Sequence, residues 1–383
     1  MKKFCVLTAL ILVLGAAAFA DDAKVMPMMV GRVYVAPTYS FALGSYDAGA
    51  NYDSFDDTPG LQLFNLSFAL EYGVIDWITA AVQWAPGWTP WSNADNLAAS
   101  NQSIKTLAAA SGKDPEAIVN GVADLFVGAK IQILGEKAPV KSSQFRLALG
   151  PGVVVPLPGP DFDEEVDNLL KGDTMTINKL DNHVFAAGAR LYFDYIINEH
   201  FFINLYNETL FYPLKQDLNK DGPNLAMAKE GLAANLAGPF PALVPELDKI
   251  EGEVNYKYRL TFEVEPAYTT SIAPGISVTA SLPINYRFIP PYDYSVDVPA
   301  TLSASPAAGG VNKALAAAGL DEGVPQHSLN LKPTVAFFFT KTPTPLEFEL
   351  YYDVPVLGKN IAAARHSLTL MAKIYFALPG RPQ

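Results

Sequence analysis

The sequence predicts an all-β fold: a transmembrane antiparallel up-and-down β-barrel of about 12 strands, with 14 as the alternative, and long outer loops that contain short helices. Three observations predict it. The chain begins with an export signal, apolar and polar residues alternate in twelve segments, and the links between these segments are short and long in turn.

The first 20 residues, MKKFCVLTALILVLGAAAFA, have the pattern of a cleaved secretory signal. Lys2 and Lys3 precede an apolar run, 6–17, which is shorter than the roughly 20 residues of a spanning helix, and a small-x-small site precedes Asp21. Cys5 is the only cysteine, so we expect no disulfide framework in the exported chain. We expect residues 1–20 to be a signal peptide and residues 21–383 to form a single barrel domain.

The composition favours a membrane protein. Charged residues make up only 17% of the chain and aromatic residues 11%, which is low in charge for a soluble protein. The net charge of −12 argues against nucleic-acid binding. After the signal, no stretch is apolar for long enough to cross a bilayer as a helix, so the membrane fold that we expect is a closed barrel.

Twelve segments show the period-two alternation of a β-strand. In the last one, Leu368 and Leu370 share one face, and Thr369 and Met371 share the other. The segments are 32–43, 64–72, 78–84, 124–133, 145–157, 184–197, 201–211, 254–268, 276–288, 329–339, 346–356 and 367–378.

The links after even-numbered segments are turns of a few residues, whereas 46–60, 89–121, 158–182, 214–252 and 290–327 are long. An even strand count with short links on one side is typical of an outer-membrane barrel, so we expect the outer membrane of a diderm bacterium. The alternative is a soluble sandwich or lipocalin-like barrel. Strands of about ten residues, longer than usual in soluble proteins, and Trp and Tyr near strand ends argue against it.

The alternation also predicts which charged side chains face the lumen, because a charge facing lipid costs about 2 to 4 kcal/mol at mid-membrane. These residues either pair across neighbouring strands, which we favour, or line a screened polar pore. The inward set is Arg32, Glu71, Asp124, Lys130, Arg146, Arg190, Asp194, Glu208, Lys257, Arg259, Glu263, Glu265, Arg287, Lys332, Glu347, Glu349, Asp353 and Lys373.

The long loops contain Ala- and Leu-rich stretches, 96–110, 224–237 and 312–320, that we interpret as short amphipathic helices. They either pack on each other as a lid or form an apolar landing surface for a ligand.

Prolines such as Pro283 and Pro333 occur within the strands and predict bulges, ends or gaps. Pro86 and Gly87, in the third segment, are the best candidates for a strand kink.

Two short runs, Leu-Glu-Tyr-Gly-Val-Ile-Asp-Trp at 70–77 and Gly-Val-Ala-Asp-Leu-Phe-Val-Gly-Ala-Lys at 121–130, resemble hairpins of the long-chain fatty-acid transporter family and its aromatic-hydrocarbon relatives. The resemblance implies uptake of hydrophobic molecules through outer-loop helices and a kinked third strand. The sequence departs from that family in two ways. Those barrels have fourteen strands and an N-terminal plug, and the short segment before residue 32 leaves no room for such a plug.

No catalytic constellation is present, so we expect neither an enzyme nor a cofactor. His327–Ser328 and His366–Ser367 are adjacent pairs, and a strand would direct the two side chains of each pair to opposite faces. Asp217, Asn219 and Asp221 have the spacing that begins a calcium loop, but the twelfth position is Ala228, and we favour a solvated turn over a calcium site.

We therefore expect a channel for passive uptake of small, hydrophobic molecules. The alternatives are a general polar diffusion porin and a surface-exposed adhesin or ligand-binding barrel. The expected partners are outer-membrane lipid, a small-molecule substrate and the outer-membrane assembly machinery.

Overall fold

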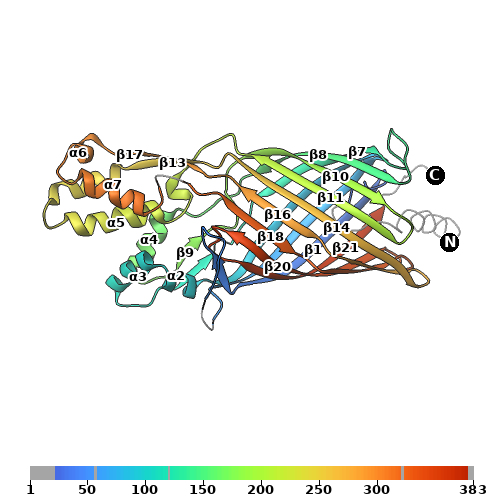
Figure 1. The fold of residues 1–383 in the computed structure, drawn as a ribbon, viewed down its shortest axis with the longest axis horizontal. Helices are drawn as coiled ribbons and strands as arrows, with labels where there is room; N and C mark the ends of the chain where they lie inside the picture. Colours follow the sequence, from blue (N-terminus) through green and yellow to red (C-terminus); the bar gives the residue numbers. More distant parts are fainter. Residues whose placement is uncertain (1–21, 56–57, 120, 321–322, 378–383) are drawn as a thin grey trace.

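A computed structural model describes residues 22–55, 58–119, 121–320 and 323–377, so the predicted signal peptide lies outside the described residues. Within these ranges, twelve antiparallel strand positions form one closed barrel, as predicted (Figure 1). The barrel strands are β1 (Val30–Ala42), β4 (Leu61–Ile75), β5 (Ile78–Asn93), β7 (Leu125–Leu134), β8 (Phe145–Val155), β10 (Ala186–Ile196), β11 (Phe201–Phe211), β14 (Tyr258–Ala273), β15 (Ile276–Ser281) with β16 (Ile284–Ile289), β18 (Gln326–Leu331) with β19 (Thr334–Phe339), β20 (Leu346–Lys359) and β21 (Arg365–Ala377).

Each strand pairs with its neighbour in sequence, and β1 with β21 completes the ring. Two strand positions are interrupted at prolines, because proline has no N–H to donate to the ladder. β15 and β16 are separated by Leu282 and Pro283, and β18 and β19 by Lys332 and Pro333. The carbonyl of Pro283 still accepts from Lys332 N at 2.9 Å, so the wall remains continuous across the break.

The barrel wall has polar side chains on its inner face and apolar side chains on its outer face, the reverse of a soluble protein. Along β20, Glu347 is 0% and Glu349 6% exposed, whereas Phe348 is 41% and Leu350 50% exposed. Carboxylates are thus enclosed, and large apolar side chains cover the outside. Such a surface is stable only against hydrocarbon, so the barrel spans a membrane.

The helices lie at one end of the barrel, which we call the cap end, and short turns such as 76–77 and 198–200 lie at the other, the turn end (Figure 1). None of the helices in the described ranges could cross a membrane, given their length and hydropathy. The helical elements are α2 (Asp95–Ser100), α3 (Gln102–Ala108), η1 (Ala109–Ser111), α4 (Phe162–Lys171), η2 (Leu218–Lys220), α5 (Asn224–Leu236), η3 (Pro241–Lys249), α6 (Ala300–Ser303) and α7 (Ala308–Ala317). Small sheets join them: β2 (Gly44–Tyr46) with β3 (Tyr52–Ser54), β6 (Ala117–Val119) with β9 (Met175–Asn178), and β12 (Gln216–Asp217) with β13 (Glu251–Asn255) and β17 (Asp293–Asp297).

These helices and small sheets form the cap, whose apolar residues pack on each other as a lid, one of the two predicted arrangements. Leu232 of α5 and Val311 of α7 share a buried cluster with Leu210 and Tyr212 at the end of β11. Helix α5 matches its predicted range, whereas α7 begins and ends a few residues before the predicted 312–320. Helix α4 was not predicted, although Asp161 caps its first turn and Gly172, with φ 74°, ends it.

The predicted segment 254–268 is wrong at its beginning. Residues of β13 pair with β17 in the cap, and the barrel strand β14 begins only at Tyr258. Lys257 lies between them with φ 60°, and its N–H donates to the side chain of Asn255 at 2.9 Å. This local hydrogen bond competes with the ladder and ends the strand. Lys257 therefore pairs with Asp293 of β17, at 2.8 Å, and does not lie on a barrel strand.

Candidate functional site in the barrel interior

A short N-terminal segment, 22–29, crosses the barrel interior near the turn end. Ala23 packs with Tyr192 on one side of the ring, and Met26 packs with Phe338 and Tyr375 on the other. The segment is too short for the plug of the fatty-acid transporter family, as predicted from its length, but it nevertheless enters the lumen.

Polar side chains of the wall hold this segment by its backbone. Asp194 accepts from Ala23 N at 2.9 Å, and Lys130 donates to the carbonyl of Asp22 at 2.7 Å. Gln132 donates to the carbonyl of Ala23 at 2.9 Å, and Thr79 accepts from Met26 N at 2.7 Å. Backbone groups that would otherwise be buried without partners are thereby satisfied.

Buried ion pairs fill the turn end of the lumen. Lys373 Nζ lies 2.7 Å from a carboxylate oxygen of Glu347 and 2.8 Å from one of Glu349, and all three residues are buried. Arg32 binds Glu71 through two nitrogens, at 2.6 and 3.1 Å. The pairs join neighbouring strands, which is the arrangement that the sequence favoured over a free polar lining.

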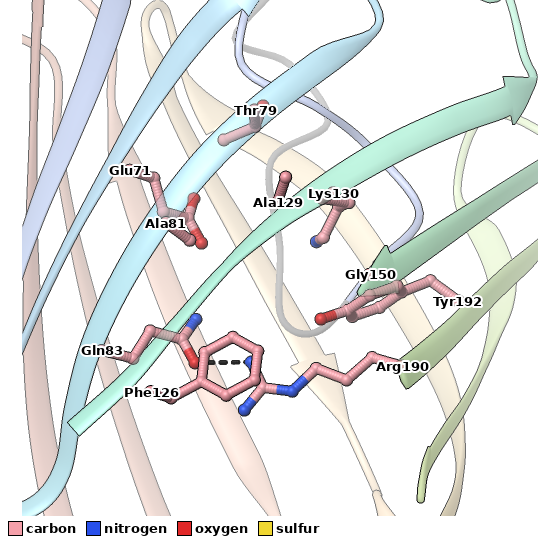
Figure 2. A pocket seen from close by; sticks show the side chains of 10 residues that line it. All are labelled: Glu71, Thr79, Ala81, Gln83, Phe126, Ala129, Lys130, Gly150, Arg190 and Tyr192. Atoms are coloured by element: carbon pink, nitrogen blue, oxygen red, sulfur yellow. Dashed lines mark hydrogen bonds between the residues drawn. The ribbon is translucent and has the colours of Figure 1, made fainter. Parts of the chain in front are cut away.

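Side chains from β4, β5, β7, β8 and β10 line a small cavity in the barrel interior (Figure 2). Arg190 donates to Gln83 at 2.6 Å and to Glu208 at 2.7 Å, and its guanidinium lies 3.6 Å from the centre of the Phe126 ring. The ammonium of Lys130 lies 4.0 Å from the centre of the Tyr192 ring. A cavity between these side chains has a volume of about 10 Å³, room for about one water molecule. This cavity is therefore too small to hold a solute larger than water.

The remaining charged residues of the predicted inward set have these partners. Arg146 pairs with Asp194 at 3.5 Å, Lys332 with Glu263 at 3.9 Å, Arg259 with Glu208 at 3.5 Å and with Asp181 at 3.8 Å, Glu265 accepts from Asn204 at 2.8 Å, Asp353 accepts from Asn330 at 2.7 Å, and Asp124 accepts from His183 N and Leu157 N at 2.9 Å. Asp124 precedes β7 and fastens loop backbone, so its role is in the cap and not along the lumen wall.

Arg287, on β16, differs from the rest of the set. Among the described residues it has no carboxylate within 4.0 Å, and its buried Nε atom has no hydrogen-bond partner. Arg365, at the cap end of β21, lies on the same face as buried Thr369 and Lys373 and is exposed. The sequence interpretation missed Arg365, because the twelfth segment began at residue 367, although its alternation extends back to Arg365.

Uncharged residues of the interior were also missed. Thr79, Gln83 and Gln132 all make interior hydrogen bonds, but only charges were used to define the inward set. Their position on the inward register of the predicted strands is the signal that could have found them.

The predicted kink in the third segment coincides with an irregular stretch of β5. The pairing of β4 with β5 changes register on both sides of Leu66, which is opposite Trp88. Pro86 and Gly87 lie in the irregular stretch between Trp84, which is opposite Phe68, and Trp88. Gly87 has φ 79°, and a Cβ there would lie 2.1 Å from the carbonyl oxygen of Leu66. Only glycine fits this position. Beyond Gln83, β5 leaves the regular ladder with β7 and keeps single bonds, such as Thr89 N to Gly121 O at 2.7 Å.

The calcium candidates do not converge. Asp217 accepts from Asn219 N at 2.9 Å, Asn219 donates to Asp163 at 2.7 Å, and Asp221 binds Tyr256 and Lys179. In the described part of the chain, no group of three or more His, Cys, Asp or Glu side chains could hold a metal ion.

A polar network lies inside the cap. Lys179 donates to the Tyr256 hydroxyl at 2.6 Å and to Gln216 at 3.0 Å, and Tyr256 donates to Asp221. Burial lowers the pKa of Lys179, although Asp221 acts in the opposite direction. Burial also raises the pKa of Tyr292, which packs edge-on against Tyr256, to about 12. The cap is therefore held by buried polar groups as well as by its apolar cluster.

Several solved structures are similar to this chain over most of its length. An outer-membrane channel from Pseudomonas putida F1 has a TM-score of 0.53 and 13% identity, with 94% of this chain and 100% of that chain covered. The Ralstonia pickettii toluene transporter TbuX has a TM-score of 0.33, 7% identity and coverage of 91% and 89%. A Pseudomonas aeruginosa FadL homologue has a TM-score of 0.31, 9% identity and coverage of 91% and 90%.

Of these three structures, the Pseudomonas putida channel is the one whose TM-score is high enough to indicate a shared fold. No protein-family model and no curated protein matches the chain. The likeness covers nearly the whole chain and confirms the predicted fold class. The chain has the fold of a bacterial outer-membrane channel.

Proposed function

We propose that this protein is an outer-membrane channel of a diderm bacterium for the passive uptake of small, hydrophobic molecules. The observation that carries the proposal is the combination of an apolar cap at one end of the barrel with an interior in which inward charges are engaged in ion pairs between strands. The apolar cluster of the cap is closed on itself, so an opened lid would offer apolar contacts to solutes that water solvates poorly.

The paired charges of the interior argue against the general polar porin. Sixteen-stranded porins leave an aqueous channel, whereas this ring has twelve strand positions, and its cavity at Arg190 and Lys130 holds about 10 Å³. The inward charges that pair in this interior fasten neighbouring strands. A hydrophobic solute would have to displace side chains and the segment 22–29 transiently, whereas hydrated ions would meet a closed path.

We further propose that residues 21–383 form the mature single-domain barrel, inserted by the outer-membrane assembly machinery, and that it is a transporter and not an enzyme. The likeness to an outer-membrane channel supports this indirectly.

Two measurements test the function. In planar bilayers, the purified protein should give no steady ohmic conductance. Cells that produce it should take up a labelled fatty acid faster than cells without it. The variant Leu232→Ser with Leu236→Ser, which places hydroxyls in the buried cluster of α5, should lower this uptake, whereas Ala234→Ser on the exposed face of α5 should not. Ohmic steps without fatty-acid uptake would support the polar porin instead.

A further inference from the structure

A bridge of two side chains crosses part of the barrel interior (Figure 2). Arg190 of β10 donates to Gln83 of β5 at 2.6 Å, although β8 and β7 lie between these two strands in the ring. Both ends of the bridge are held in place, since Arg190 also donates to Glu208 at 2.7 Å and Gln83 donates to Tyr34 at 3.2 Å. We call Arg190 and Gln83 the lumen bridge.

Phe126 of β7 supports the lumen bridge from the wall. The guanidinium of Arg190 lies 3.6 Å from the centre of the Phe126 ring, which is a cation–π contact. On the other strand of this pair, a Cβ added to Gly152 of β8 would lie 2.3 Å from the ring, so the absence of a side chain there makes room for it. The ring therefore contacts both the wall at Gly152 and the cation of the bridge.

Phe126 also belongs to the apolar core of the cap. It packs against the buried cluster that contains Val311 of α7, and Val154 of the same cluster is opposite Phe126 in the register of β7 with β8. One side chain thus contacts the cap cluster and the lumen bridge. Because packed apolar side chains fix each other's positions, opening of the cap would remove contacts that hold this ring.

We propose that Phe126 couples the cap to the lumen bridge. When the cap opens, the ring is released, Arg190 loses its support, and its bond to Gln83 breaks. Arg190 keeps Glu208 as its counterion during this step, so no buried charge is left alone. This inference rests on the proposed function, because it concerns how the same pathway opens.

The test uses a single cysteine as a reporter. The only cysteine of the chain is Cys5, in the predicted signal peptide, so Ala81→Cys places one thiol in the exported chain. Ala81 lines the cavity beside the lumen bridge. The measurement is the rate at which a methanethiosulfonate reagent with a quaternary ammonium group labels this thiol in the full exported chain, folded in lipid vesicles. Access from the turn end is the same in all variants below.

Loosening of the cap should expose the reporter. Val311→Ala, which leaves a cavity in the cap cluster, should raise the labelling rate by about tenfold. Gly152→Ala should raise it as well, because the new methyl group displaces the Phe126 ring. Gly231→Ala in α5 is the matched control, since its Cβ would meet no atom within 4 Å, and it should leave the rate unchanged.

Phe126→Ala determines whether the ring is the link. Labelling should already be fast in this variant, and the addition of Val311→Ala should raise the rate by less than about twofold. An equal increase from Val311→Ala with and without Phe126, or no increase in either, would overturn the coupling and leave the uptake of hydrophobic molecules untouched. Failure of wild-type uptake would instead overturn the proposed function.

A second variant covers the case in which Phe126→Ala does not fold, as judged by its mobility on unheated gels. Gln83→Ala removes the acceptor of Arg190 and no part of the apolar cluster. The lumen bridge is then broken from the start, so Val311→Ala should again add little to the labelling rate. A tenfold increase in this background would overturn the proposal.

Discussion

The turn end and the cap end of the barrel interior contain the same kinds of charged residue in different arrangements. At the turn end, Lys373 has two carboxylates within 2.8 Å, and Arg32 binds Glu71 through two nitrogens. At the cap end, Arg287 has no such carboxylate among the described residues, and Arg259 reaches its partners only at 3.5 Å or more. The two ends therefore differ in how completely their cations are paired, and this difference should appear in stability.

The largest effect is expected at Lys373. The change Lys373→Met leaves Glu347 and Glu349 buried without a cation, which should lower the free energy of unfolding by about 3 to 5 kcal/mol. The measurement is a urea titration of protein folded in vesicles, followed by the mobility of the folded band on unheated gels.

The control for this prediction removes all three charges together. Lys373→Met combined with Glu347→Gln and Glu349→Gln should recover most of the lost stability, because no buried charge is then left alone. A single variant as stable as wild type would show that the turn end does not depend on its ion pairs.

Alkaline pH should weaken the cap end. Burial raises the pKa of Tyr292 to about 12, so the folded cap binds this proton more tightly than the unfolded chain does. The resulting stability is complete below about pH 10 and is lost as the pH rises to about 12, a difference of about 2 to 3 kcal/mol. Limited proteolysis of the cap, read against tyrosinate absorbance, should show cleavage rising in this window.

Tyr292→Phe provides the comparison for the pH experiment. The variant cannot ionise at this position, so the rise in cleavage should be smaller and should begin later. An identical pH profile in both proteins would assign the transition to other groups.

The fold was predictable because alternation is a local property of the chain. Each barrel strand needs only its own residues to define an inward and an outward face, and Phe348 and Glu349 show both faces side by side. The prediction was wrong where a competing local interaction intervened, as at Lys257, whose N–H bonds to Asn255 and ends the strand. Pro283 and Pro333 marked their interruptions correctly.

The site was less predictable because it depends on contacts that are distant in sequence. Ala23 N bonds to Asp194, 171 positions away, and nothing in the apolar and polar pattern of 22–29 indicates that partner. Alternation placed Arg287 and Lys373 on the inward face alike. Only the ring order of the strands determines that one has two carboxylates beside it and the other has none within the described residues.

A smaller loss of stability is expected when the hydrogen bond between the N-terminal segment 22–29 and the barrel wall is removed. Asp194→Ala removes the acceptor of Ala23 N and should cost about 1 to 3 kcal/mol of local stability. Release of the segment should open the turn end, so bilayer recordings should show brief openings that wild type lacks. Asp76→Ala, which removes a solvent-exposed bond to Met28 N, should leave the recordings nearly silent. Equal opening in both variants would contradict a specific role for the buried bond.

The smallest effect on stability is expected at Arg287, and it most sharply tests the contrast between the two ends. Arg287→Met removes a charge that has no carboxylate partner in the described structure, so no acidic group loses its counterion. The free energy of unfolding should change by less than about 1 kcal/mol, or rise slightly, because the buried Nε donor of Arg287 lacks a partner in the described structure and is itself unfavourable. In the same urea titration, Lys373→Met should be much less stable. A loss at Arg287 as large as that at Lys373 would mean that the cap-end arginine already has a stabilising partner, and the contrast between the two ends would then disappear.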